Sequence, residues 1–132
     1  MDTFNGSTNE IGMKSLNTTN LLDIFKHNTR KHKEKVNIHI GMSKDILRQL
    51  RHEPTYDLIY IDGSHESHNI LEDAVLSHDL LKQYGLLIFD DYLWTGPSSK
   101  TPNIEIYSFV NIYEEFYEIL WSDYQVICKK KI

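Results

Sequence analysis

Acidic side chains follow two apolar runs of the sequence, at the point where each run ends. Residues 56–61 are followed by Asp62 and a glycine, and residues 86–89 are followed by Asp90 and Asp91. Each run has the length and composition of a buried parallel strand. Open α/β sheets bind ligands at the carboxyl ends of their strands. The sequence therefore predicts a carboxylate cluster in a ligand crevice.

Such a cluster supports two kinds of chemistry. Asp62, Asp90 and Asp91 offer the hard oxygen ligands that Mg²⁺ prefers, and a bound Mg²⁺ lowers the pKa of a hydroxyl that it contacts. His65, close behind Asp62, is a candidate general base that removes a proton from a substrate hydroxyl. The alternatives are acids that form turns or cap helices, and a histidine that is simply a solvated residue at a helix start.

Helices that alternate with strands must position these groups. The pattern predicts an α/β fold with a mostly parallel sheet, helices on both faces and an antiparallel C-terminal hairpin. The expected helices begin after an Asn20 N-cap, at 44–50, at 67–83 with Gly85 as the stop, and from an Asn103 cap through 117. The other expected elements are a strand at 36–40, a surface loop at 93–103, and hairpin strands at 118–121 and 124–128.

Length and composition bound the class of protein. The chain has 132 residues, enough for one domain, and its net charge of −5 argues against nucleic-acid binding. No apolar run is long enough to span a membrane. The single cysteine, Cys128, excludes an internal disulfide and favours a reducing cytoplasm.

A short basic segment stands out against this acidic balance. Its cationic residues are Lys26, Arg30, Lys31, Lys33 and Lys35. They follow a predicted helix, so we interpret them as a solvated face that also complements the helix dipole.

The motifs together resemble those of class I S-adenosylmethionine-dependent methyltransferases. The similar branch acts on small molecules and includes catechol O-methyltransferase and the sugar methyltransferases of macrolide biosynthesis. The matching segments, in chain order, are Asp2-Thr3-Phe4, residues 40–43, residues 57–65, residues 80–92 and residues 124–127. The resemblance implies direct methyl transfer from S-adenosylmethionine to a hydroxyl of a small molecule or sugar, possible help from Mg²⁺, and a substrate-side role for the loop at 93–103.

The resemblance also implies roles for single residues. Asp2 would hold the cofactor ribose, and Met42 and Ser43 would flank its adenine. Asp62 and Gly63 would face its methionine end, His65 and Asp62 would serve catalysis, and Asp62, Asp90 and Asp91 would hold a metal. The alternatives are a disordered chain end for Asp2, a strand-end residue for Met42 and a helix cap for Ser43.

One part of the family pattern is missing. The family's cofactor site begins with a first strand that ends in a glycine-rich loop, and no G-x-G occurs in this sequence. We therefore expect residues 1–132 to form a single, incomplete, N-terminally truncated domain with a partial Rossmann-like sheet. Its unpaired strand edges would favour a homodimer. The alternative function is a non-catalytic remnant that acts as a binding or assembly module, or a fragment of a longer enzyme.

Overall fold

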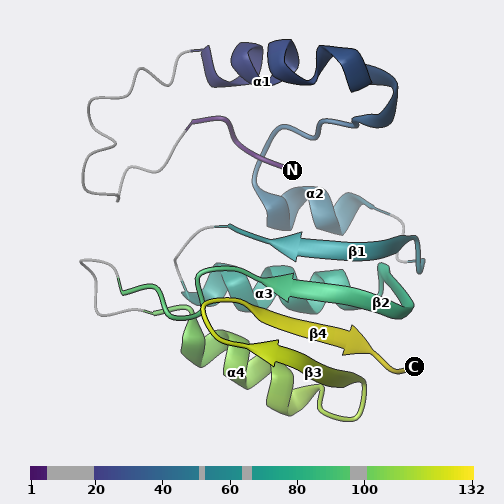
Figure 1. The fold of residues 1–132 in the computed structure, drawn as a ribbon, viewed down its shortest axis with the longest axis vertical. Helices are drawn as coiled ribbons and strands as arrows, with labels where there is room; N and C mark the ends of the chain where they lie inside the picture. Colours follow the sequence, from purple (N-terminus) through teal and green to yellow (C-terminus); the bar gives the residue numbers. More distant parts are fainter. Residues whose placement is uncertain (6–19, 51–52, 64–66, 96–100) are drawn as a thin grey trace. The chain divides into compact units, whose positions relative to one another are not determined.

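A computed structural model describes residues 1–5, 20–50, 53–63, 67–95 and 101–132. The chain divides into two compact units, Met1–Ile46 and Leu47–Ile132 (Figure 1). The single domain expected over residues 1–132 stays a prediction.

The first unit is built from short helical segments. These are α1 (Leu21–Thr29), the 3-10 helix η3 (Arg30–Lys35) and the start of α2 (Ser43–Gln49), which crosses into the second unit. Asn20 is the N-cap of α1 as predicted, although its side chain makes no capping hydrogen bond. The strand predicted at 36–40 is wrong, because this segment forms only one isolated parallel bridge, between Asp2 and Ile40. One bridge between two residues is too short to form a strand.

The second unit contains a four-stranded sheet in the order β1-β2-β4-β3. Its strands are β1 (Tyr56–Ile61), β2 (Leu81–Phe89), β3 (Tyr117–Ser122) and β4 (Val126–Lys130). The pairing of β1 with β2 is parallel, and the other two pairings are antiparallel. The α/β class and the C-terminal hairpin are confirmed, while the sheet of this unit is mixed rather than mostly parallel.

The core of this unit lies between the sheet and two helices, α3 (Ser67–His78) and α4 (Asn103–Ile112). Both helices lie on one face of the sheet (Figure 1). Phe89 from β2 packs edge-on against Phe109 from α4, with 5.6 Å between ring centres. Leu87 and Cys128 are fully buried on the same face. The sequence predicts helices on both faces of the sheet, whereas α3 and α4 lie on the same face.

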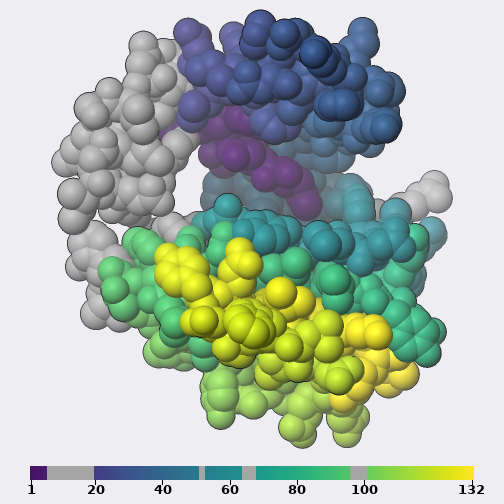
Figure 2. Space-filling view, in the orientation of Figure 1, coloured from purple at the N-terminus to yellow at the C-terminus, as the bar shows by residue number. Residues whose placement is uncertain are grey.

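The opposite face of the sheet carries an apolar row across all four strands. The pairings align Tyr60 with Ile88, Ile88 with Ile127, and Ile127 with Trp121. Tyr60 is 46% exposed and Trp121 is 58% exposed. Figure 2 views this face, and residues of all four strands reach its surface.

The helix α3 ends earlier than its sequence pattern predicts. It was expected to reach residue 83, but it ends at His78, and β2 begins at Leu81. The buried ammonium group of Lys130 donates to the carbonyl oxygens of His78 (2.7 Å) and Leu81 (3.0 Å). Leu80 also accepts the backbone N–H of Tyr56 at 3.0 Å. Contacts from distant strands thus override the helical periodicity.

Two further predictions about α4 are wrong. Pro102, not Asn103, occupies the N-cap position, and the Asn103 side chain accepts a hydrogen bond from the Thr101 hydroxyl. The helix ends at Ile112, so Tyr117 belongs to β3 rather than to the helix face.

None of the described helices combines the length and the apolar character that a membrane crossing requires.

Gly85 is not a helix stop but a close-contact position in β2. A Cβ at this position would lie 2.8 Å from Leu81 Cδ1, 2.9 Å from the carbonyl oxygen of Lys82 and 3.0 Å from that of Asp57. Two of these atoms belong to the backbone, so they cannot move aside as a side chain would. Gly85 therefore lets β2 stay close to β1 where their pairing is irregular.

We expect Gly85→Ala to destabilise the fold by about 1–3 kcal/mol, the usual cost of overpacking. Urea unfolding followed by circular dichroism measures the loss. Gly63→Ala is the matched control, because among the described residues a Cβ there meets only Asp73 Oδ2, at an ordinary 3.5 Å. Equal stability of the two variants would contradict the close packing at Gly85.

Candidate functional site

The predicted acids meet at the carboxyl ends of β1 and β2. Ile61 pairs with Phe89, and the backbone N–H of Asp90 donates to the Ile61 carbonyl at 3.0 Å. A small cavity of about 10 Å³ lies at this point, roughly the smallest space that holds one water molecule. Its lining includes Asp62, Gly63, Asp90 and Asp91. The strand pairing thus brings together residues that are nearly thirty positions apart in the sequence.

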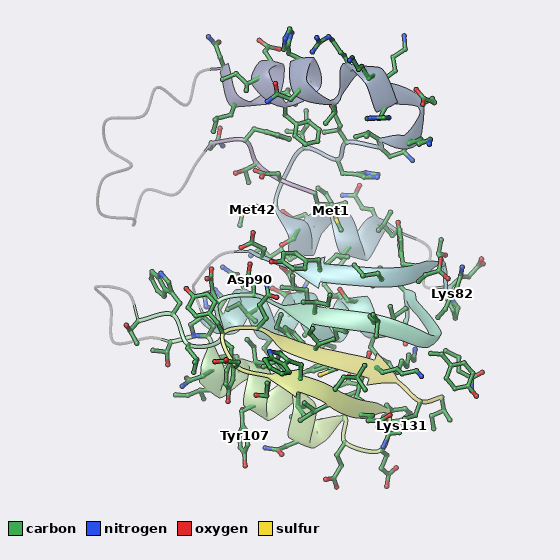
Figure 3. The ribbon with its side chains drawn as sticks, viewed as in Figure 1. Met1, Met42, Lys82, Asp90, Tyr107 and Lys131 are labelled. Carbon is green, nitrogen blue, oxygen red and sulfur yellow. The ribbon has the colours of Figure 1, made fainter. Side chains whose placement is uncertain are left out.

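Asp90 is held by three donors. The Tyr60 hydroxyl donates to its Oδ2, and the Gln125 side-chain amide donates to its Oδ1 at 3.0 Å. The backbone N–H of Asp91 donates to the same Oδ1 at 2.9 Å. The Gln125 amide also contacts the Tyr60 hydroxyl at 3.0 Å. This network fixes the carboxylate at the end of β2, while Lys82 lies at the opposite end of that strand (Figure 3).

The network sets the protonation of both partners. The pKa of Tyr60 is raised to about 12, chiefly by the hydrogen bond that its hydroxyl makes with Asp90. Burial and the negative charges of Asp90, Asp62 and Asp91 raise it further. Burial works to raise the pKa of Asp90, but the hydrogen bonds from Tyr60, Gln125 and Asp91 outweigh it and hold that pKa below its usual value. At neutral pH the pair is therefore a neutral phenol beside an ionised carboxylate.

Asp91 turns the chain away from the strand. Its φ of +57° lies in the left-handed region, and its carbonyl accepts the N–H of Trp94 at 2.9 Å. A hydrogen bond with the Asp91 carboxylate raises the pKa of Tyr124. Tyr124 also accepts the backbone N–H of Tyr92 through its own carbonyl, at 2.8 Å. The strand end is thus tied to the β3–β4 turn.

Sequence reasoning missed a buried carboxylate next to the site. Asp73 on α3 is only 5% exposed, and its Oδ2 lies 3.5 Å from the place that a Cβ on Gly63 would take. The glycine after Asp62 therefore lets the end of β1 approach an acid of the helix. No local signal marks Asp73, because the helix side predicted to be buried carries Leu71 and Val75, and Val75 is 41% exposed in the structure.

Other predicted cofactor residues lie in the first unit. The N–H of Asp2 donates to the His39 carbonyl at 3.1 Å, and its carbonyl accepts the Gly41 N–H at 3.0 Å. The bridge at Ile40 therefore places Asp2 beside the turn that carries Met42 and leads to Ser43, the first residue of α2. The Asp2 carboxylate itself accepts the N–H of Phe4 at 2.6 Å.

Two predictions are not settled by this geometry. His65 lies outside the described residues, as does part of the loop at 93–103. Among the described residues, no group of three or more His, Cys, Asp or Glu side chains has the arrangement of a metal site. The metal role of Asp62, Asp90 and Asp91 therefore stays a prediction.

Comparisons with known proteins bear on the family and the fold of the chain. Residues 5–92 match the model of a family described as a methyltransferase domain. The fold is similar to the crystal structure of a Staphylococcus aureus protein assigned as a caffeoyl-CoA O-methyltransferase, with a TM-score of 0.55 and 22% identity. The similarity covers 85% of this chain but only 60% of that protein. The search among curated proteins gives no match.

The hydrogen bond between Tyr60 and Asp90 makes a prediction about pH. We expect the Tyr60 hydroxyl to titrate near pH 12 rather than 10.0, and its pKa to fall in Asp90→Asn, which removes the carboxylate charge. Because the folded-state pKa is raised, the stability that this bond contributes is present below pH 10 and is lost as pH rises through about 12.

NMR of the protein labelled at tyrosine ring carbons measures this titration, and Tyr60→Phe assigns the signal. A Tyr60 signal that titrates near the ordinary tyrosine pKa of 10.0 would contradict the network.

Proposed function

We propose, from the premise that the chain belongs to the methyltransferase domain family, that it transfers a methyl group from S-adenosylmethionine to a hydroxyl of a small molecule or sugar. The observation that carries the proposal is the meeting of Asp62, Asp90 and Asp91 at the carboxyl ends of two adjacent parallel strands. Ligands of open α/β sheets bind at this edge. The chain spans 60% of the length of its structural neighbour, so its activity is proposed rather than transferred.

The chemistry of the acids fits the proposed cofactor. S-adenosylmethionine supplies a methyl group on a positively charged sulfonium and also carries an ammonium group, and ionised carboxylates attract both charges. Asp62 and Gly63 would hold the methionine end. The cavity beside them admits about one water molecule, so the cofactor would lie over its mouth. Asp2, Met42 and Ser43 would contact the ribose and the adenine.

The residues of the site differ in what they can do to a proton. Asp90 accepts hydrogen bonds from Tyr60, Gln125 and Asp91, so it serves as a fixed negative charge and is a weak base. The raised pKa of Tyr60 keeps its hydroxyl protonated, so it orients Asp90 instead of accepting a proton. Removal of the acceptor proton falls to Asp62 or His65. The protein otherwise contributes by aligning the acceptor with the methyl group.

A magnesium ion held by Asp62, Asp90 and Asp91 stays a prediction. The described residues do not form a metal site, and three of the lone pairs of Asp90 are already used by hydrogen bonds. We therefore derive no step through a metal. The acceptor itself, within the class of small hydroxyl compounds, is not specified by these residues.

A second candidate function, an assembly module, rests on the open parts of the sheet. In the sheet of the second unit β1 is an edge strand, and its Leu58 is 50% exposed. Such edges and apolar faces favour association with another chain. We propose that the partner is a second copy of this chain, which would form a homodimer, and that the chain binds neither nucleic acid nor a membrane. The free, buried thiol of Cys128 accords with a cytoplasmic location.

The cofactor proposal predicts that the purified chain binds S-adenosylhomocysteine and that Asp62→Ala weakens binding about tenfold or more, the effect of losing a charge-assisted hydrogen bond. Isothermal titration calorimetry measures the affinity. Asp57→Ala is the matched control, because Asp57 is an acid near the start of β1, at the end away from Asp62, and forms an ion pair with Lys82 at 2.9 Å. No binding at millimolar ligand would remove the enzyme proposal and leave the assembly module.

The assembly proposal predicts a homodimer that Leu58→Lys weakens, because a charge would be placed on the exposed face beside the strand edge. Sedimentation velocity measures the mass. Tyr107→Lys, which places the same charge on a 63% exposed aromatic of α4, should leave the dimer intact. A monomeric wild-type chain at all accessible concentrations would contradict this candidate.

A further inference from the structure

The basic segment of the first unit lines an open hollow that the methyl-transfer proposal does not use. The hollow has a volume of about 270 Å³. It is lined by Lys26, Thr29, Arg30, Lys33, Val36 and Ile38. All of these residues belong to the unit Met1–Ile46, so the hollow is formed within that unit. Three cationic side chains therefore share one cavity with an apolar wall.

The local backbone explains how these side chains gather. Lys26 and Arg30 are four residues apart on α1 and its C-cap, a spacing that puts them on one side of the helix. The helical path is interrupted at His32, whose φ of −127° is not helical, before Lys33. The chain then becomes extended at Val36 and supplies the apolar wall. The hollow thus has a charged side and a hydrophobic side.

Helix-dipole compensation does not account for this much positive charge. The carboxyl end of a helix carries roughly half a negative charge, which one cation offsets. Arg30 already fills that role, because its guanidinium donates to the His27 carbonyl at 2.6 Å. Within the described residues, no ion pair joins Lys26 or Lys33 to a carboxylate. Two lysines that line the hollow are therefore left without a described counter-charge.

We propose that this hollow binds a small organic phosphate, with the phosphate against Lys26, Arg30 and Lys33 and the organic part against Val36 and Ile38. A phosphate ester or diphosphate carries the two or more negative charges that match these cations, and lysine and arginine are its usual protein partners. The cavity is slightly smaller than most cofactor pockets, so it suits a fragment of nucleotide size or less. The proposal is independent of the methyl-transfer site.

Nucleic acid is the competing ligand, and the shape argues against it. A polyanion binds along an extended positive surface, whereas these cationic residues line one hollow. The net charge of −5 for the whole chain also opposes a long polyanion.

Isothermal titration calorimetry of the full chain with ADP, inorganic pyrophosphate and adenosine tests the proposal. We expect ADP to bind more tightly than pyrophosphate and adenosine to bind undetectably. Binding of ADP should weaken as ionic strength rises. Equal affinity for ADP and pyrophosphate would overturn the role of the apolar wall, and no binding of either at millimolar concentration would overturn the site. Tighter binding of a single-stranded oligonucleotide than of ADP would overturn the choice of ligand.

The matched variants are Lys33→Gln and Lys31→Gln. Both remove one charge from η3, but only Lys33 lines the hollow. We expect Lys33→Gln to weaken ADP binding about tenfold, the cost of one charge-assisted contact, and Lys31→Gln to change it less than twofold or so. Equal losses in the two variants would show a diffuse charge effect and overturn the site. Affinity for S-adenosylhomocysteine should be unchanged in both, which separates this proposal from the methyl-transfer one.

Discussion

The parallel pairing of β1 with β2 is the constraint on which the rest of the site depends. It places Ile61 opposite Phe89, so that the residues that follow both strands leave the sheet at the same edge. The pairing is maintained on one side by the buried packing of Phe89 and Leu87 against α3 and α4. It is maintained near its start by Gly85, where no side chain would fit. Without this register Asp62 and Asp90 would not share a cavity.

The antiparallel hairpin completes the site rather than merely closing the sheet. Lys130 of β4 donates hydrogen bonds at the end of α3, and these fix where the helix ends and β2 begins. Gln125 of the β3–β4 turn donates hydrogen bonds to Asp90 and Tyr60. The same hairpin therefore sets the start of β2 and the charge state at its end. This links a structural element at the C-terminus to the chemistry of acids that lie far from it in sequence.

Sequence patterns predicted the parts of this arrangement that depend on local composition. The acid-ended strands, the short helix at 43–49 and the terminal hairpin follow from hydrophobic runs and turn residues. The end of α3 was not predictable, because it is fixed by Lys130, which lies 52 residues after His78. The segment 36–40 alternates like a strand but finds only one pairing. The Tyr60–Asp90–Gln125 network and the burial of Asp73 depend on tertiary contacts that no local pattern encodes.

If the proposed function holds, Asp62 and Asp90 belong to one cofactor site. A double-mutant cycle with Asp62→Asn and Asp90→Asn, measured by calorimetry with S-adenosylhomocysteine, tests whether they do. We predict that the two losses of binding energy are coupled by more than about 0.5 kcal/mol, as for residues that share a ligand or a network. Losses that add within about 0.3 kcal/mol, or variants that bind as well as the wild type, would contradict it.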